Sequence, residues 1–92
     1  TAIEGEVRRI LELSEQPLVA VNLPDVKKGE KVILLIEGID VDDVRDRLVK
    51  GGMAPMMIPS DVYSVEAVPV LGSGKTNFSA AREMAEAMAR PV

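Results

Sequence analysis

A chain of 92 residues, 47% of them hydrophobic, has material for one small domain with a modest core. It contains no cysteine and no histidine, which excludes disulfides, thiol and imidazole catalysis and metal sites built on those residues, and favours a binding module or part of a larger enzyme. The balance of 11 basic against 15 acidic side chains, a net charge of −4, argues against a nucleic-acid binder.

The start of the chain is predicted to be an amphipathic helix. Its apolar residues recur three or four positions apart, which places on one face Ile3, Val7, Ile10 and Leu11. Thr1 and Glu4 have the spacing of a capping box, and Pro17 marks a limit downstream. Because the first residue is not Met, we expect the chain to be a piece of a longer protein.

Two strands are predicted next. The run Leu18 to Leu23 predicts a short strand that ends at Pro24, and a turn at Lys27 to Glu30 leads into a second strand, Lys31 to Glu37. The second run is continuously apolar from Val32 to Ile36, which indicates burial on both faces. This run is far shorter than the roughly 20 residues that a membrane span requires.

A second helix is predicted after Gly38. Asp40 is expected to cap it, with Asp42 and Asp43 in its first turn, where the helix dipole favours negative charge. Its end is expected at the glycine pair 51–52. We expect its buried side to consist of Val41, Val44, Leu48 and Val49.

The last third is predicted to hold one strand and one helix. Val62 to Val68 has a β-like pattern, Gly72 to Thr76 is a glycine-rich loop, and Phe78 to Ala89 has a helical pattern. The side chains expected to face the core are Ala81, Met84, Ala85 and Met88. The order α-β-β-α-β-loop-α predicts an α/β (α+β) fold in which helices cover a small mixed three-stranded sheet, as one domain over residues 1–92.

The glycine-rich loop is the segment that best suits a ligand. A nucleotide-binding P-loop is excluded, because its first glycine would fall on Pro69, which lacks an amide hydrogen. Gly72, Ser73 and Gly74 would still let a backbone approach a ligand and move, and Lys75 presents a positive charge shortly before a helix. A surface turn with a solvated lysine is the simpler alternative, and composition alone favours it.

Other groups of side chains have simpler structural explanations. Methionine often fills gaps in a core, which explains Met53, Met56 and Met57. A solvated turn explains Lys27, Lys28 and Lys31. Chemistry at a helix start explains the aspartates at positions 40, 42 and 43, and no metal site is predicted. Tyr63 is expected to be a half-buried strand residue.

The stretch Pro59 to Lys75, PSDVYSVEAVPVLGSGK, resembles the last sequence signature of the acyl-adenylate-forming enzymes. That superfamily includes acyl-CoA synthetases, adenylation domains of nonribosomal peptide synthetases and luciferases. Its C-terminal domain typically has a strand, a Leu-Pro-like pair, a short spacer and Ser-Gly-Lys, and here Val68-Pro69 and Ser73-Gly74-Lys75 take those places.

The resemblance covers nearly the whole chain in order. Ile3 to Val7 is similar to the helix that opens this domain, and the run from Pro17 to the Lys-Gly-Glu turn at 28–30 also matches. The small polar pair and aromatic after Lys75, and the segment Met57 to Asp61, are similar to the synthetase part of a bifunctional acylglycerophosphoethanolamine acyltransferase/acyl-acyl-carrier-protein synthetase.

The resemblance implies the C-terminal lid domain of an AMP-forming fatty acid ligase, which uses ATP and Mg²⁺ to make an acyl-adenylate and then passes the acyl group to a phosphopantetheine thiol. It implies that Lys75 is catalytic and bridges the substrate carboxylate and the α-phosphate, and that Gly72, Ser73 and Gly74 form the nucleotide/phosphate loop. The N-terminal adenylation domain would hold most of the ATP, and the isolated chain is expected to be inactive.

The implied partners are that N-terminal domain, a fatty acid, and either acyl carrier protein or CoA, with no nucleic acid and no membrane contact by the chain itself. The resemblance also implies a cytoplasmic location, with the whole protein at the cytoplasmic face of the inner membrane and a use in lysophospholipid reacylation. The alternative is a non-catalytic α/β interaction module of a larger protein, which the missing histidine and cysteine and the ordinary charge balance would suit.

Overall fold

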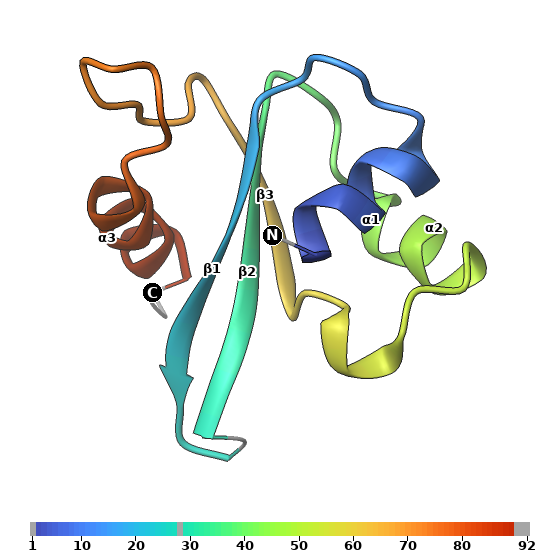
Figure 1. Ribbon diagram of the computed structural model, residues 1–92. Helices are drawn as coiled ribbons and strands as arrows, with labels where there is room; N and C mark the ends of the chain where they lie inside the picture. Colours follow the sequence, from blue (N-terminus) through green and yellow to red (C-terminus); the bar gives the residue numbers. More distant parts are fainter. Residues whose placement is uncertain (1, 28, 90–92) are drawn as a thin grey trace.

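A computed structural model describes residues 2–27 and 29–89, so Thr1, with its predicted capping box, and Lys28 lie outside the described residues. The helices and strands follow the predicted order (Figure 1): α1 (Ala2–Leu11), β1 (Leu18–Asp25), β2 (Gly29–Glu37), α2 (Val44–Lys50), the short 3-10 helix η1 (Pro55–Met57), β3 (Asp61–Val65) and α3 (Phe78–Ala89). The strands form one sheet in the order β1-β2-β3, with β2 antiparallel to β1 and parallel to β3. The predicted mixed three-stranded sheet and α/β class are confirmed.

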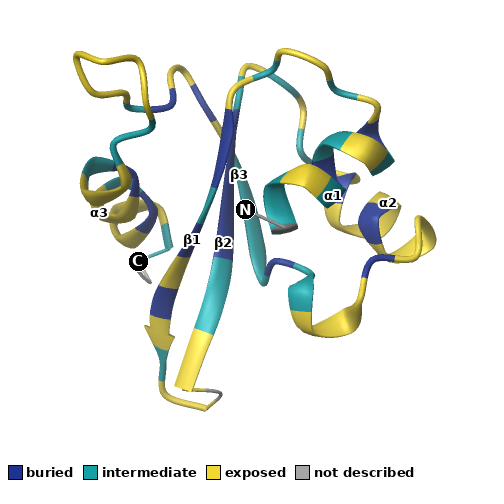
Figure 2. Cartoon of the chain, in the orientation of Figure 1, coloured by how far each residue is buried: buried dark blue, intermediate teal, exposed yellow. Residues whose placement is uncertain are grey.

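Helices cover both faces of the sheet, with α3 on one face and α1 and α2 on the other (Figure 1). The central strand β2 contributes to both cores: Ile33 and Leu35 pack on the α3 side, and Leu34 and Ile36 on the other. All four side chains are 0% exposed, which confirms the predicted burial on both faces. Figure 2 shows buried residues along the middle of the sheet and exposed ones near the β1–β2 turn.

Strand β1 continues through Pro24 to Asp25, so the predicted end at Pro24 is wrong. The amide of Glu37 donates to the carbonyl of Pro17 over 2.9 Å, which places the odd-numbered residues of β1 in the hydrogen-bonded pairs with β2. Pro24 is even-numbered, so its backbone nitrogen faces the open edge of the sheet. Its missing hydrogen therefore removes no bond to β2, and the strand can pass through it.

Helix α2 begins at Val44, and the prediction that Asp40 caps it is wrong. The Asp40 carboxylate accepts a hydrogen bond from the Asp42 amide over 3.0 Å, which makes a local turn before the helix. Its N-cap is Asp43, whose side chain makes no capping bond. Val49, expected to be buried, is 53% exposed, whereas Val44 and Leu48, four positions apart on one face of the helix, lie in the core.

The third strand is shorter than predicted and the last helix agrees with the prediction. Strand β3 ends at Val65, three residues before the expected end. Helix α3 covers Phe78–Ala89, and its two fully buried residues are Ala81 and Ala85, which let the helix lie close to the sheet. Met88, expected in the core, is 39% exposed. Among the helices of the described segments, none has the length and apolar character needed to cross a bilayer.

Tyr63 lies on β3, half-buried against the α3-side core as predicted, and burial together with the nearby Asp61 carboxylate raises the pKa of its hydroxyl. A raised pKa means that the folded state holds the proton more tightly than the unfolded chain does. The stability that this contributes is present below the ordinary tyrosine pKa of about 10 and is lost as pH rises through the folded value. We therefore expect unfolding to become easier in strong alkali, and Tyr63→Phe to remove that part of the pH dependence.

The measurement is a urea unfolding series across alkaline pH for both proteins. Tyr63 is the chain's single tyrosine, so the absorbance of tyrosinate reports its titration directly. Equal alkaline loss of stability in the two proteins would show that another group controls it.

Candidate functional site

The segment between β3 and α3 forms a hairpin, which we call the Lys75 hairpin and define as residues 69–77. At its base the Asn77 amide donates to the carbonyl of Pro69 over 2.9 Å, and the next pair is an antiparallel bridge between Val70 and Thr76. Nearer the tip, the Leu71 amide donates to the carbonyl of Lys75 over 2.7 Å. The hairpin projects beside the start of α3, at the end of the molecule opposite the β1–β2 turn (Figure 1).

The tip is a three-residue turn that depends on one glycine. The Gly74 amide donates to the carbonyl of Leu71 over 2.9 Å, and Gly74 has φ +88°. Gly72 and Ser73 do not have positive φ, so the geometry is a type I turn followed by a left-handed residue, a common hairpin loop. Glycine is favoured at position 74, whereas a Cβ at Gly72 would meet open space. The predicted glycine-rich loop is therefore the closed tip of a hairpin.

Lys75 follows this turn and has a fixed backbone with a free side chain. Its carbonyl is held by Leu71, but its exposed ammonium group makes no hydrogen bond or ion pair with any residue that the structure describes. A lysine ammonium on a long flexible stem is a point charge that can meet a phosphate or a carboxylate. Lys75, Gly72, Ser73 and Gly74, predicted together from the sequence, therefore do lie together on one exposed turn.

Asn77 joins the hairpin to α3, and sequence reasoning missed it. Its side-chain Oδ1 accepts a hydrogen bond from the Ala80 amide over 3.1 Å, and its carbonyl accepts one from Ala81 over 2.9 Å. This is the bonding of a helix N-cap, for which asparagine is among the preferred residues. The signal was available in the sequence, since Asn77 directly precedes the predicted start of α3.

We expect Asn77→Ala to lower the free energy of unfolding by about 1 kcal/mol, because the Ala80 amide loses its acceptor. Chemical denaturation measures the change. Asn77→Asp is the matched control, because aspartate offers an oxygen at the same place and caps about as well. Equal losses for the two variants would mean that the cap bond does not carry the effect.

A carboxylate from the sheet holds the segment that leads into the hairpin. Glu37 Oε1, at the end of β2, accepts a hydrogen bond from the Val68 amide over 2.9 Å. The two residues are 31 positions apart, so no local sequence pattern connects them. Two apolar side chains of the hairpin, Val70 (60%) and Leu71 (47%), and Phe78 directly after it (52%) are largely exposed.

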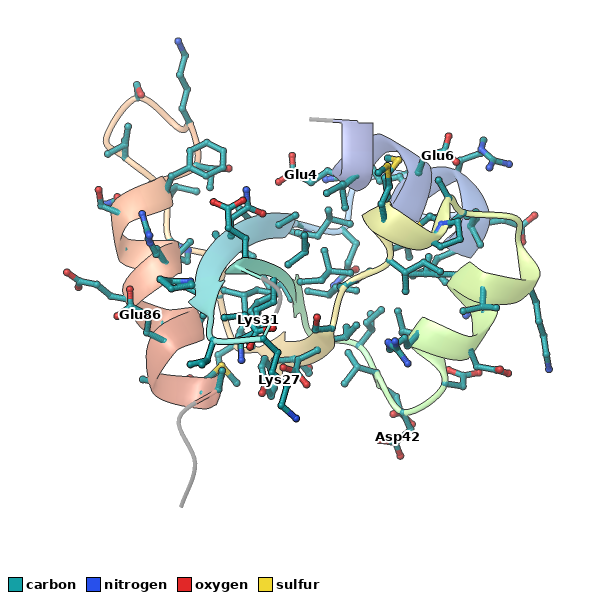
Figure 3. The ribbon with its side chains drawn as sticks, turned by 90° about the horizontal axis from the view of Figure 1, so that it is seen from below. Glu4, Glu6, Lys27, Lys31, Asp42 and Glu86 are labelled. Carbon is teal, nitrogen blue, oxygen red and sulfur yellow. The ribbon has the colours of Figure 1, made fainter. Side chains whose placement is uncertain are left out.

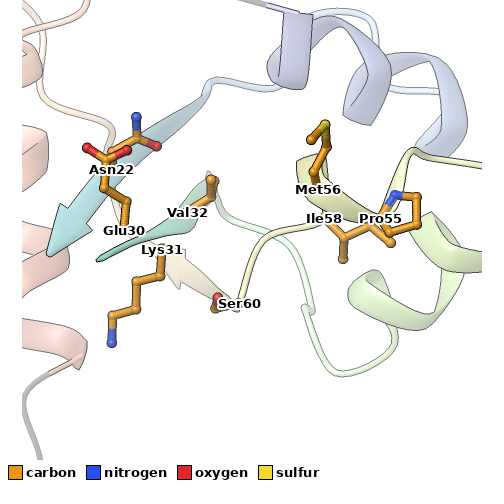
Figure 4. Close-up of a pocket in the computed structure, with 8 residues that line it drawn as sticks. All are labelled: Asn22, Glu30, Lys31, Val32, Pro55, Met56, Ile58 and Ser60. Carbon is orange, nitrogen blue, oxygen red and sulfur yellow. The ribbon is translucent and has the colours of Figure 1, made fainter. Parts of the chain in front are cut away.

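The methionines singled out from the sequence, together with Lys27 and Lys31, lie away from the Lys75 hairpin, and Lys28 falls outside the described residues. Met53 is buried in the core as expected, but Met56 is 88% exposed and lines a surface hollow of about 370 Å³ with Lys31 (Figure 4). In that view Asn22 and Glu30 lie on one side of the strands and Lys31 extends on the other. Because these polar groups do not converge, the hollow offers no built binding site.

The acidic side chains of Glu4 and Glu6 have hydrogen-bond partners, and Asp42 lies on the surface. Glu4 accepts a hydrogen bond from the Ala20 amide over 2.9 Å, and Glu6 pairs with Arg9 at 2.7 Å. Figure 3 shows the two glutamates apart on α1 and Asp42 at the rim of the molecule. The hydrogen bond from Arg9 holds the pKa of Glu6 below its ordinary value. Within the described ranges, no three acidic side chains are placed to hold a metal ion.

No family model matches the chain. Among solved structures, an AMP-forming acyl-CoA synthetase/AMP-acid ligase II-like protein from Dyadobacter fermentans matches 90% of the chain with a TM-score of 0.72 at 18% identity. A fatty acyl CoA synthetase from Mycobacterium tuberculosis matches 90% with a TM-score of 0.73 at 20% identity. ATP-bound MatB from Rhodopseudomonas palustris matches 97% with a TM-score of 0.74 at 21% identity. The chain has the fold of one part of these proteins.

The matched part is a minor share of each larger protein. The chain covers 25% of the Dyadobacter protein and 18% of each of the other two. At these identities the likeness establishes the fold, and it agrees with the superfamily resemblance carried by the sequence. It does not distinguish the bifunctional subgroup from other members.

Proposed function

We propose that the chain is the C-terminal lid domain of an AMP-forming fatty acid ligase and that Lys75 is its catalytic group. The observation that carries the proposal is an exposed lysine with no partner among the described residues, presented by a closed hairpin on a fold shared with AMP-forming acyl-CoA synthetases.

The proposed reaction has two steps. A fatty acid carboxylate oxygen attacks the α-phosphorus of ATP, the bond from that phosphorus to the bridging oxygen breaks, and pyrophosphate leaves. The sulfur of a phosphopantetheine thiol then attacks the acyl carbon and gives up its proton to water, the bond from that carbon to the phosphate oxygen breaks, and AMP leaves. In the first step an anionic carboxylate must approach the phosphorus of an anionic phosphate, and the ammonium group of Lys75 would offset their repulsion.

The exposure of Lys75 suits a domain that acts by closing onto another. In water a single positive charge gives little stabilisation, because the solvent screens it. When the hairpin enters a site from which water is excluded, the same charge acts in a lower dielectric and its effect grows. The exposed apolar residues beside it, Val70, Leu71 and Phe78, would then be covered by the N-terminal domain.

ATP and Mg²⁺ would be bound mainly by the N-terminal adenylation domain, and no group of acidic side chains among the described residues is placed to hold a metal ion. The proposal places the whole protein in the cytoplasm, at the inner face of the inner membrane, and takes the acyl acceptor to be acyl carrier protein or CoA. The subgroup resemblance adds lysophospholipid reacylation as the use of the acyl group.

The test is fatty acid-dependent exchange of pyrophosphate into ATP by the whole protein, with and without residues 1–92. We expect removal of the chain to lower exchange by about 100-fold or more, because Lys75 is lost with it. Transfer from purified acyl-adenylate to acyl carrier protein or to CoA then identifies the acceptor.

The second candidate function, a non-catalytic interaction module, is favoured by the three exposed apolar side chains of Val70, Leu71 and Phe78. Undiminished exchange after removal of the chain would support that function and contradict the ligase proposal.

A further inference from the structure

Glu37 lies where three segments of the chain meet. It is the last residue of β2, and its amide donates to the carbonyl of Pro17, just before β1, over 2.9 Å. The next amide, that of Gly38, donates to the carbonyl of Val65 at the end of β3 over 3.0 Å. The backbone at Glu37 is therefore held on both sides, which fixes the point from which its side chain starts.

The side chain of Glu37 reaches beyond the sheet. Strand β3 ends at Val65, so Val68 has no strand partner for its amide, and that amide donates to Glu37 Oε1 over 2.9 Å. The Val68 side chain is only 6% exposed and belongs to the core on the α3 side. A donor in this partly buried place is costly to leave without an acceptor, and a carboxylate is a strong acceptor.

Val68 directly precedes the Lys75 hairpin. The carbonyl of Pro69 accepts the first cross-hairpin bond, from Asn77, and two further pairs lead to Lys75. Glu37 thus anchors one leg of the hairpin to the sheet, while the cap formed by Asn77 anchors the other leg to α3. Because the start of the hairpin is held on the sheet and its end on α3, these two elements set the direction in which Lys75 points.

We propose that Glu37 is a positioning residue for Lys75, an inference that rests on the proposed function. The proposed role requires no contact with the substrate or with the lysine, because Glu37 acts by holding Val68. Stabilisation of a transition state by a charge depends on placement to within about 1 Å, and a misplacement of that size costs about 100-fold in rate. Releasing Val68 would let the base of the hairpin pivot, so the loss should fall on the step that uses Lys75.

The first experiment compares Glu37→Ala and Glu37→Gln in the whole protein, with Glu66→Ala as control. Glu66 is an exposed glutamate on the same connection. We expect Glu37→Ala to lower kcat of pyrophosphate exchange by about 100-fold, with KM for ATP little changed. Glu37→Gln retains an accepting oxygen and should lose about threefold or less. Thioester formation from supplied acyl-adenylate should be the same in all variants.

The second experiment follows backbone hydrogen exchange by mass spectrometry in the same proteins. In Glu37→Ala, peptides that cover residues 69–77 should exchange about tenfold faster, because their anchor is lost, while peptides that cover β2 should be unchanged. This measurement needs no activity, so it tests the anchoring independently of the proposed function.

Two results would overturn the positioning role. One is the lack of a change specific to the hairpin in Glu37→Ala: hydrogen exchange is either unchanged in residues 69–77 or faster to the same degree throughout the domain. The other is faster hydrogen exchange in the hairpin of Glu37→Ala while its pyrophosphate exchange stays normal, although Lys75→Ala abolishes pyrophosphate exchange. If Lys75→Ala itself leaves pyrophosphate exchange intact, the proposed function fails instead, and the hydrogen-exchange result still decides whether Glu37 anchors the hairpin.

Discussion

Lys75→Ala is expected to lower fatty acid-dependent pyrophosphate exchange by the whole protein by about 100- to 1,000-fold. The magnitude is that of removing one fixed group that stabilises developing charge in a site without water. The loss should appear in kcat, because the charge matters most when the carboxylate and the α-phosphate come together. Initial rates at saturating ATP and fatty acid measure it.

Two comparisons make the result specific to the first step. Transfer of the acyl group from supplied acyl-adenylate to a thiol should be unaffected by Lys75→Ala, because Lys75 is proposed to act before that step. Stability should change by less than about 0.5 kcal/mol, since the Lys75 side chain is exposed and makes no hydrogen bond or ion pair with the described residues. Normal exchange with Lys75→Ala would contradict its catalytic role.

Leu35→Ala is expected to lower the free energy of unfolding by about 2–5 kcal/mol. Leu35 lies at the centre of the sheet on the middle strand β2 and is 0% exposed, so its removal leaves a cavity that surrounding strands cannot close. A domain of this size is stabilised by only about 5–15 kcal/mol, which makes the loss a large part of the total. Urea denaturation, with the slope checked for two-state behaviour, gives the value.

Met56→Ala is the control for the core prediction. Met56 is 88% exposed, so its truncation should change the free energy of unfolding by less than about 0.5 kcal/mol. Leu34→Ala should cost as much as Leu35→Ala, because Leu34 is equally buried on the opposite face of the same strand. Similar small effects for Leu35→Ala and Met56→Ala would mean that β2 is not the centre of the core.

The features predicted correctly from the sequence are those that depend on local pattern. The continuous apolar run of β2 requires burial on both faces, and the helical spacing from Phe78 onward gives the bounds of α3 as observed. The start of α2 was misplaced because an aspartate that forms a turn and an aspartate that caps a helix look alike in sequence, and Asp40 does the former. The continuation of β1 through Pro24 depends on which side of the strand faces the edge, a property of the sheet register.

In the candidate site, too, residues set by a local sequence pattern could be predicted, and contacts set by tertiary structure could not. Lys75 and its glycines form a contiguous motif, so sequence reasoning could find them. Glu37 reaches Val68, just before the hairpin, because β2 and β3 are parallel neighbours, which brings the end of β2 beside the segment after Val65. Contacts of this kind are set by tertiary structure and leave no signal in a single sequence.

The outer edge of β1 has a consequence for how the protein behaves at high concentration. Four even-numbered residues, 18, 20, 22 and 24, direct their backbone groups away from β2, where a strand from another molecule could attach. The Ala20 amide is already bonded to the Glu4 carboxylate, and Pro24 has no hydrogen to donate. A strand from another molecule would therefore lack every second amide donor along this edge. This loss of hydrogen bonds disfavours fibre growth from an edge that the sheet otherwise leaves open.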